Sequence, residues 1–495
     1  MTLQQAIDKM QELEKNLHAY GHAMGVLSVD GATAAPRGSA QGRGETLGVL
    51  SGVYHSLMVS GETGEILQTI LASREQCDHK TFRQAEVLKE QYDELTRIPV
   101  AEYMAYETLV ANADAVWHEA KEKSDFPLFA PYLEQLVAYN RRFAAYKDDT
   151  KPAYDVLLDG FEKGASTATL DPFFALLRQE LTPVIQEVAK RPAPRTDFLH
   201  AYYPAERQRV FSDRLMAMMG IDRTYCAIAE TEHPFTDGFN KHDVRITTHY
   251  DEHDVSSSMY SVIHEGGHAL YELGSGDELE GTCLAGGSTM GIHESQSRFY
   301  ENLIGRSRPF CEALLPVMRD LFPEQLAGVT AEELYRAVNL ARPSLIRTEA
   351  DELTYSMHVM VRYELEKRLM AGELAVKDLP GEWNRMYMEY LGVDVPDDRR
   401  GVLQDSHWSG GAFGYFPSYA LGSAYGVQML RAMEREMDVW GPVSRGDLAP
   451  VTAWLRENIH RHGKLLLPAQ LLEQACRAPF DPHVYVAYLK EKYAG

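Results

Sequence analysis

The chain has 495 residues, of which 45% are hydrophobic and 24% are charged, a composition typical of a soluble globular protein with an ample core. Asp and Glu outnumber Lys and Arg by 72 to 49, which gives a formal net charge of −23. Because this excess of negative charge repels phosphate groups, we expect no nucleic-acid partner and no membrane partner.

The cysteine pattern and the first residues bear on the cellular compartment. The five cysteines are far apart and form no C-x-x-C pair, which favours reduced thiols in a cytoplasmic protein. The opening residues, MTLQQAIDKMQELEKN, carry charge throughout and lack the apolar stretch of a secretory signal. The uncharged run 408–430 is long enough to span a bilayer, but its glycines, serines and Pro417 make it too polar and too interrupted. We expect it to be a buried or cleft-lining segment.

Helical spacing of apolar residues is the main pattern of the first half of the chain. A helix is predicted over residues 3–17, with Gly21 able to end it, and the Gly-, Ala- and Ser-rich residues 27–45 predict a loop. Further helices are predicted at 45–59, at 80–95, at 101–147 with a break at Phe126 and Pro127, and at 170–190.

The middle of the chain breaks this helical pattern once. In residues 243–250, DVRITTHY, β-branched residues dominate and apolar and polar positions partly alternate, which predicts a short strand in a small sheet. Helices are predicted again from about residue 311 to 342, at 345–369, at 450–461 and in the last residues of the chain.

The stretch 261–272, SVIHEGGHALYE, contains an H-E-x-x-H motif made of His264, Glu265 and His268. On a helix, residues four apart lie on one face, so both imidazoles can reach one metal ion. The carboxylate of Glu265 then lies beside the metal, where it can take a proton from a bound water. This arrangement predicts a metal-dependent hydrolase.

Two glycines, Gly266 and Gly267, stand between these histidines. Each costs about 1 kcal/mol relative to Ala in the interior of a helix. We interpret them as clearance that lets a substrate or a neighbouring backbone approach the metal closely.

A catalytic zinc site normally has three protein ligands, so a third ligand must come from elsewhere. Glu294, in GIHESQSRFYENL, follows 26 positions after His268 and is the preferred candidate. His293 and Glu301 are its rivals. Because adjacent residues on a helix point about 100° apart, His293 and Glu294 cannot both face the metal easily. Glu294 would give a His-His-Glu set of the thermolysin type, so we expect His293 to be an outer partner or a core residue.

Six separate motifs occur together in this chain. They are HPF at 233–235, DVRIT at 243–247, HEGGH at 264–268, HESQ at 293–296, IRTEAD at 346–351 and GVLQDSHW at 401–408. In their order and spacing, and over essentially the whole length, the chain resembles the carboxypeptidase Taq family of metallocarboxypeptidases.

This resemblance implies a mainly α fold, similar to neurolysin and angiotensin-converting enzyme. The expected subunit is large, helical and saddle-like, with a small β-sheet near the metal helix and a deep active-site groove. It would be a single peptidase domain, 1–495, of two helical lobes, with a catalytic segment at about 230–430. The resemblance also implies a homodimer and one divalent metal per subunit, zinc first and cobalt second, held by His264, His268 and Glu294. Glu265 becomes the general base.

Removal of one C-terminal residue requires a cation that binds the α-carboxylate of the substrate, and the planar guanidinium of Arg suits this task. Arg347 is the preferred candidate and Arg245 is the second. The alternative for either residue is an internal ion pair, for instance with Glu349, Asp351 or Asp243.

The tetrahedral intermediate needs hydrogen-bond donors aimed at its oxyanion. By resemblance to related peptidases, His233 and Tyr419 fit this role, with Tyr415 and Tyr425 as further substrate-binding tyrosines and His407 as a residue that orients substrate. Any one of these tyrosines could instead be a core aromatic.

The sequence thus predicts a cytoplasmic metallocarboxypeptidase that releases single amino acids from peptides with broad specificity. An oligopeptidase or dipeptidase on the same scaffold shares every metal residue and stays an alternative. A catalytically silent peptide-binding scaffold is a second alternative, which the intact Glu265 disfavours.

Overall fold

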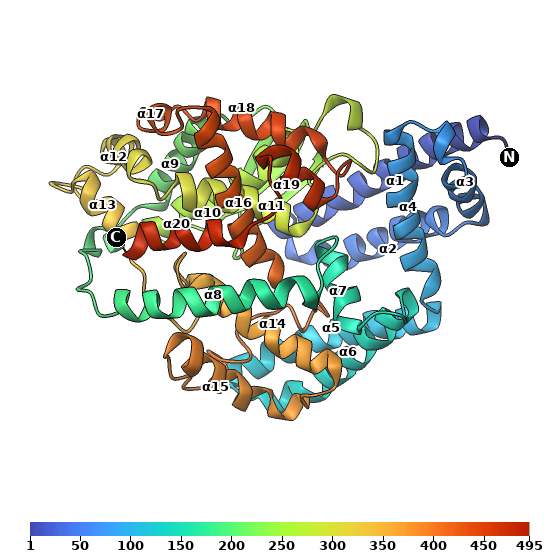
Figure 1. The fold of residues 1–495 in the computed structure, drawn as a ribbon, viewed down its shortest axis with the longest axis horizontal. Helices are drawn as coiled ribbons and strands as arrows, with labels where there is room; N and C mark the ends of the chain where they lie inside the picture. Colours follow the sequence, from blue (N-terminus) through green and yellow to red (C-terminus); the bar gives the residue numbers. More distant parts are fainter. Residues whose placement is uncertain (495) are drawn as a thin grey trace.

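The computed structural model describes residues 1–494, and helices dominate it (Figure 1). Among these residues the only strands belong to one small sheet, so the predicted mainly helical fold with a small sheet is confirmed. The first helices lie at one end of the long axis of the molecule, and the last helix lies at the other end.

The N-terminal layer consists of four helices, which are α1 (Leu3–Thr33), α2 (Ala40–Met58), α3 (Gly61–Leu71) and α4 (His79–Arg97). Thr2 caps α1 by accepting a hydrogen bond from the backbone N–H of Gln5. These helices bury a hydrophobic cluster of their own, centred on Met10, Leu67 and Leu88.

The prediction that Gly21 ends the first helix, with a loop over 27–45, is wrong. Helix α1 continues through Gly21 to Thr33, and α2 begins at Ala40. An interior glycine costs only about 1 kcal/mol and does not by itself stop a helix. The break lies beside Pro36, because a proline disfavours helical backbone in the residue before it.

Five helices follow in the chain. They are α5 (Val100–Lys123), α6 (Phe126–Lys147), α7 (Ala153–Phe161), α8 (Thr167–Val188) and α9 (Ala205–Met218). The predicted break between α5 and α6 is confirmed. Ser124 adopts a left-handed backbone conformation, with a φ of 54°, and Pro127 stands in the first turn of α6.

The sheet contains β1 (Cys226–Glu230), β2 (Thr236–Asn240) and β3 (Asp243–Thr248) in the order β1-β3-β2. Strand β3 runs parallel to β1 and antiparallel to β2, which confirms the predicted strand at 243–250. The sheet packs against helix α10 (Val255–Leu273), which carries the H-E-x-x-H motif. Asp254 caps α10 by accepting a hydrogen bond of 3.0 Å from the backbone N–H of Ser256.

Helix α11 (Met290–Arg298) runs directly into the π-helical turn η5 (Phe299–Ile304). The remaining helices are α12 (Arg308–Leu321), α13 (Ala331–Val338), α14 (Tyr355–Ala371), α15 (Leu379–Leu391), α16 (Pro417–Glu436), α17 (Trp440–Val443), α18 (Ala449–Asn458), α19 (Pro468–Cys476) and α20 (Pro482–Ala494). Helix α14 starts ten residues after the predicted start at 345. The carboxylate of Asp351 accepts the backbone N–H groups of Leu353 and Thr354, which delays the helix.

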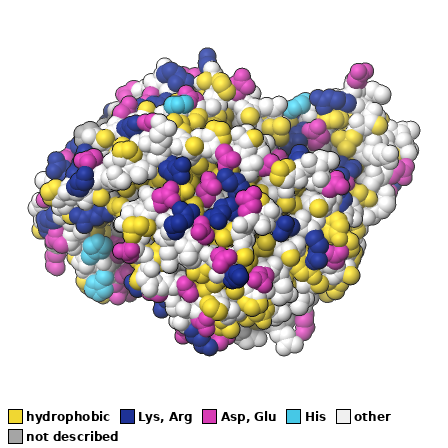
Figure 2. Space-filling view, turned by 60° about the horizontal axis from the view of Figure 1, so that its bottom comes forward, with side chains coloured by type: hydrophobic (Ala, Val, Ile, Leu, Met, Phe, Trp, Pro, Cys, Tyr) yellow, Lys and Arg dark blue, Asp and Glu magenta, His cyan; other side chains and the backbone are white. Residues whose placement is uncertain are grey.

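Helix α16 lies in the main core, as expected for the uncharged run 408–430. Its Gly422 packs against Glu294, because a Cβ placed on it would lie 2.7 Å from the Cβ of Glu294. No helix in residues 1–494 combines the length and apolar character needed to cross a membrane. On the face shown in Figure 2, acidic and basic side chains are interleaved, so the negative net charge is not gathered into one patch there.

Candidate metal centre and active site

Two helices bring the three predicted metal ligands together. His264 and His268 lie one turn apart on α10, and Glu294 faces them from α11. The Nε2 atoms of the two histidines lie 3.8 and 3.6 Å from Oε2 of Glu294, and the candidate ligand atoms all lie within 4.8 Å of one another. Tetrahedral zinc with nitrogen and oxygen ligands separates its donors by about 3.4 Å. This donor set therefore fits one divalent ion.

The outer atoms of the same three side chains are occupied by protein groups. Nδ1 of His264 lies 2.8 Å from Oε2 of Glu301, and Nδ1 of His268 lies 2.6 Å from Nδ1 of His293. Nε of Arg298 donates to Oε1 of Glu294 at 2.7 Å. Because both Nδ1 atoms are engaged, both Nε2 lone pairs are left for a metal.

The two rival ligands, His293 and Glu301, thus lie behind the histidines. Burial alone would raise the pKa of Glu301, but Arg298 and His264 hold it well below its usual range. Glu301 is therefore an ionised carboxylate near neutral pH and can accept the Nδ1–H of His264.

Glu265 is buried beside this group, on the turn that joins the two histidines. The hydroxyl of Thr236, on β2, donates to Oε2 of Glu265 at 2.7 Å and fixes its carboxylate. Burial raises the pKa of Glu265 above its ordinary value of 4.5. A carboxylate with a raised pKa is a better proton acceptor near neutral pH.

The candidate site is mostly but not fully buried. The side chains of His264, His268 and Glu294 are 20%, 16% and 8% exposed. Each of the three side chains therefore keeps some contact with solvent.

The glycines between the histidines face protein on both sides. A Cβ on Gly267 would lie 2.6 Å from the carbonyl oxygen of Gln296 and 2.8 Å from the Cα of Ser297. A Cβ on Gly266 would lie 2.7 Å from the Cε of Met219. The neighbouring backbone of α11 therefore requires Gly267, which is the predicted close approach of a neighbouring backbone, and no clearance for a substrate is needed to explain this glycine.

Arg347 is buried in an ion pair inside the protein. Its Nε donates to Oδ1 of Asp405 at 2.9 Å and its NH1 group donates to the hydroxyl of Tyr355 at 2.8 Å. Arg362 binds the other oxygen of Asp405 at 2.5 Å. The partner is Asp405, not Glu349 or Asp351. Two arginines against one aspartate leave an excess of positive charge at this point.

His407 and two tyrosines adjoin this charged group. The guanidinium of Arg347 lies 4.8 Å from the ring centre of Tyr419, and Nε2 of His407 lies 3.1 Å from the hydroxyl of Tyr419. Burial lowers the pKa of His407 to about 4, so the ring is neutral near pH 7. Burial, with the charge of Glu294 adding to it, raises the pKa of Tyr415 to about 12. The structure therefore brings Tyr415, Tyr419 and His407 together near Glu294.

The other predicted substrate residues lie apart from this group. Tyr425 is buried, and its ring packs against Phe480 with the centres 4.9 Å apart. Arg245, on β3, forms a two-point ion pair with Asp243. His233 is exposed between β1 and β2. Within the described residues, no hydrogen bond or ion pair joins His233 or Arg245 to the candidate metal ligands.

Sequence reasoning missed several residues that support the site. Thr236 holds Glu265, Tyr355 stands between Arg347 and Arg298, and Glu272 contacts His293. No local pattern marks these residues, because each meets its partner across a distance in the sequence. The HPF motif ends directly before Thr236, and Glu272 is the last residue of the stretch 261–272, but neither position reveals the contact that the residue makes.

A mainly helical protein in which an H-E-x-x-H helix and a carboxylate of a second helix converge on one point is a metal-dependent peptidase by class. The chain belongs to the carboxypeptidase Taq (M32) metallopeptidase family, whose model matches residues 9–493.

Curated relatives match over the full length. Carboxypeptidase 1 of Bacillus subtilis is 39% identical over 98% of this chain and 97% of its own length. Thermostable carboxypeptidase 1 of Thermus thermophilus is 36% identical over 100% of this chain and 99% of its own.

Solved structures agree with the fold. The M32 carboxypeptidase of Deinococcus radiodurans R1 superposes with a TM-score of 0.96 at 37% identity, covering 99% of both chains. A carboxypeptidase of Pyrococcus furiosus gives a TM-score of 0.95 at 33% identity, again over 99% of both chains. The protein is a metal-dependent carboxypeptidase, and therefore a hydrolase that acts on peptides.

Proposed function

We propose that this carboxypeptidase releases single amino acids from peptides with broad specificity and that His264, His268 and Glu294 hold one zinc ion per subunit. The observation that supports this most is the convergence of the three donor atoms within 4.8 Å, with Glu265 beside them. Two imidazoles and a carboxylate suit zinc, and cobalt is the second candidate.

Glu265 is the proposed general base. A divalent ion held by His264, His268 and Glu294 would supply Lewis-acid chemistry at the scissile carbonyl and the attacking water. Glu265 takes the proton of the attacking water and passes it to the leaving amine, while Thr236 keeps its carboxylate in place.

Arg347 is the preferred group for the α-carboxylate of the substrate, and Arg245 is the second candidate. The support for Arg347 is the excess positive charge of the Arg347, Arg362 and Asp405 group. Because Arg347 is buried, we propose that its charge acts on the substrate through the ring and hydroxyl of Tyr419.

Tyr419 and His233 are the proposed oxyanion donors, and Tyr415, His407 and Tyr425 are the proposed substrate contacts. The contacts among Tyr415, Tyr419 and His407 support those three residues. Tyr425 has the least support, because its ring packs against Phe480.

The substitution Glu265→Gln tests the proposal. Loss of the base should lower kcat by roughly 100- to 10,000-fold, while the variant still binds one metal per subunit. Steady-state kinetics and metal analysis of the purified variant measure both effects. His264→Ala is the matched control, since it should lose the metal as well as the activity. Activity of Glu265→Gln near that of the wild type would refute the assignment.

A mixed peptide incubated with the enzyme and followed by mass spectrometry tests the mode of cleavage. We expect a ladder of products that differ by one C-terminal residue, whereas internal fragments would support an oligopeptidase. We also propose a cytoplasmic homodimer. Light scattering of the purified protein should give twice the mass of one chain, and a monomer mass would contradict the dimer.

A further inference from the structure

A second carboxylate is connected to the candidate metal site through two rings. Nδ1 of His268 lies 2.6 Å from Nδ1 of His293, and Nε2 of His293 lies 2.7 Å from Oε1 of Glu272. Glu272 is on α10, one turn beyond His268, and His293 directly precedes Glu294 on α11. The two rings and the carboxylate form an uninterrupted series of hydrogen bonds.

The chemistry of the metal ligand gives this series a single direction. When Nε2 of His268 binds a metal, the ring proton of His268 must be on Nδ1, which donates to His293. Nδ1 of His293 then accepts, so the proton of His293 is on Nε2 and is donated to Glu272. Each donor meets an acceptor. The series ends on the carboxylate of Glu272, which, when ionised, can accept hydrogen bonds but cannot donate one.

We propose that Glu272 and His293 are positioning residues that orient His268 and strengthen it as a metal ligand. This inference rests on the proposed metal site at His264, His268 and Glu294. It extends the family motifs, because Glu272 lies outside the HEGGH motif at 264–268 and is not one of the three candidate metal ligands.

The two histidine ligands are supported in different ways. Glu301, behind His264, forms ion pairs with Arg298 and Arg306, so much of its charge is compensated. In the part of the chain that the structure describes, no Lys or Arg forms an ion pair with Glu272. His293 is therefore the one ionisable side chain within ion-pair distance of Glu272 in this part of the chain, and Lys464 acts on the charge of Glu272 only from farther away.

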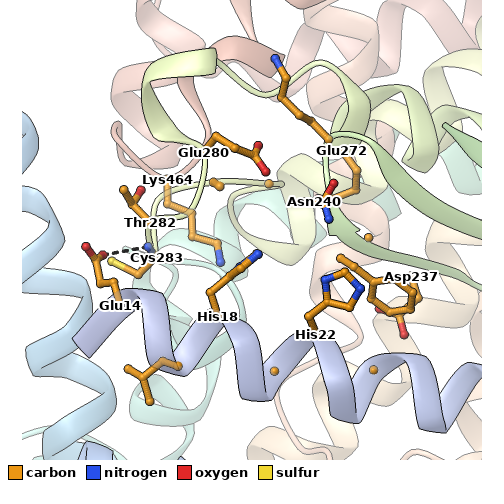
Figure 3. A pocket seen from close by; sticks show the side chains of 18 of the residues that line it. Glu14, His18, His22, Asp237, Asn240, Glu272, Glu280, Thr282, Cys283 and Lys464 are labelled. Carbon is orange, nitrogen blue, oxygen red and sulfur yellow. Dashed lines mark hydrogen bonds between the residues drawn. The ribbon is translucent and has the colours of Figure 1, made fainter. Parts of the chain in front are cut away.

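The surroundings of Glu272 leave room for this contact. A Cβ on Gly287 would lie 2.3 Å from the His293 ring, and the backbone N–H of Gly287 donates to Oε1 of Glu272 at 3.0 Å. Glu272 also lines a cavity of about 300 Å³, across from His18 and His22 of α1 (Figure 3). Glu272 projects from α10, its carboxylate accepts a hydrogen bond from the loop before α11, and it lies at the edge of this cavity.

The decisive experiment measures metal affinity of the full-length protein by competition with a chelator, using zinc, and the absorption spectrum of the cobalt form. His293→Leu removes both hydrogen bonds and should weaken zinc binding by roughly 10- to 100-fold. His293→Gln keeps an acceptor and a donor and should recover most of the affinity. Glu272→Gln keeps the shape but removes the charge and should weaken binding by about tenfold.

Glu280→Gln is the matched control, because Glu280 lines the same cavity and has no hydrogen bond to His293. It should leave the zinc affinity and the cobalt spectrum unchanged. Thermal unfolding of the metal-free variants shows whether each one is folded.

Two results would overturn the inference. In one, folded His293→Leu binds zinc as tightly as the wild type. In the other, His293→Gln is no better than His293→Leu, so that the ring gives only steric support. Failure of the wild type itself to bind zinc or cobalt would instead refute the proposed metal site, and the positioning role with it.

Discussion

Because Gly267 has no side chain, helices α10 and α11 can approach each other closely at this residue. The nearest atoms to a Cβ there are the carbonyl oxygen of Gln296 and the Cα of Ser297, which belong to backbone and cannot rotate away. These two helices carry all three candidate ligands. Packing at this glycine therefore controls the geometry of the metal group.

Gly267→Ala should destabilise the protein by about 1–3 kcal/mol, because the added methyl group overlaps backbone of α11. It should also weaken zinc binding, since α10 and α11 must move apart. Thermal unfolding and chelator competition measure these effects. Gly52→Ala is the control, as a Cβ on this exposed residue of α2 meets nothing within 4 Å and should stabilise by up to about 1 kcal/mol. An unchanged Tm for Gly267→Ala would contradict the packing argument.

The residues of the site differ in how far the sequence predicts them. His264, Glu265 and His268 follow from local helical spacing alone. The 100° between neighbours on a helix lets only one of His293 and Glu294 face the metal easily, and the His-His-Glu set favours Glu294, which the structure brings to the histidines. Thr236 and Asp405 could not be predicted, because they lie 29 residues from Glu265 and 58 residues from Arg347 and meet them only in the folded chain.

At the scale of elements, the N-terminus of α11 depends on the buried carboxylate of Glu162, which directly follows the end of α7. Oε2 of Glu162 accepts the backbone N–H of Gly291 at 2.7 Å, in the first turn of the helix that carries Glu294. Burial raises the pKa of Glu162 from 4.5 to about 7. The folded protein therefore retains a proton that the unfolded chain releases at lower pH.

This shift predicts how stability varies with pH. Because the folded state binds more protons between pH 4.5 and 7, stability contributed by Glu162 is present below about pH 4.5 and is lost as pH rises to about 7. At about 1.4 kcal/mol for each pH unit, the loss is on the order of 3 kcal/mol. Glu162→Gln should not show this loss.

Thermal unfolding of wild type and Glu162→Gln at pH 5 and pH 8 checks the prediction. The variant should gain Tm relative to the wild type at pH 8 and show little difference at pH 5. Glu373→Gln, at an exposed position, is the control and should follow the wild type at both values. Parallel behaviour of Glu162→Gln and wild type would contradict the assigned pKa.

Elements were predictable where the periodicity or a motif was clear, as at α4, α6, β3 and α10. The errors arose at α1, where an interior glycine did not stop the helix, and at α14, where Asp351 accepts backbone N–H groups just before a later start. In both cases a weak local preference was overridden by packing or by a side chain that satisfies backbone groups.

Across the whole molecule, hydrophobic contacts are divided unequally. The main cluster extends from α5 to α20 and surrounds α10, α11 and α16, whereas helices α1 to α4 pack around a smaller cluster. Among the described residues, α2 buries Met58 alone. The N-terminal layer is therefore held to the rest of the protein by fewer buried side chains.

Hydrogen exchange followed by mass spectrometry should reveal this division. Amides of α2 should exchange much faster than amides of α10, α11 and α16 under native conditions, because few buried contacts oppose local opening. Equal protection of α2 and α11 would show that the smaller cluster opens only with global unfolding.

The π-helical turn η5 has a consequence for insertions and deletions. Its wider backbone bond, from the N–H of Gly305 to the carbonyl of Tyr300 at 2.7 Å, spans five residues instead of four. Removing one residue there would restore α-helical spacing and turn everything after it by about 100° relative to everything before it. Glu294 lies before η5, whereas Glu301 lies within it. With one residue removed between them, either Glu294 could keep its place as a metal ligand or Glu301 could keep its place as the acceptor behind His264, but not both. The wide turn of η5 therefore fixes the length of this segment as firmly as any side chain.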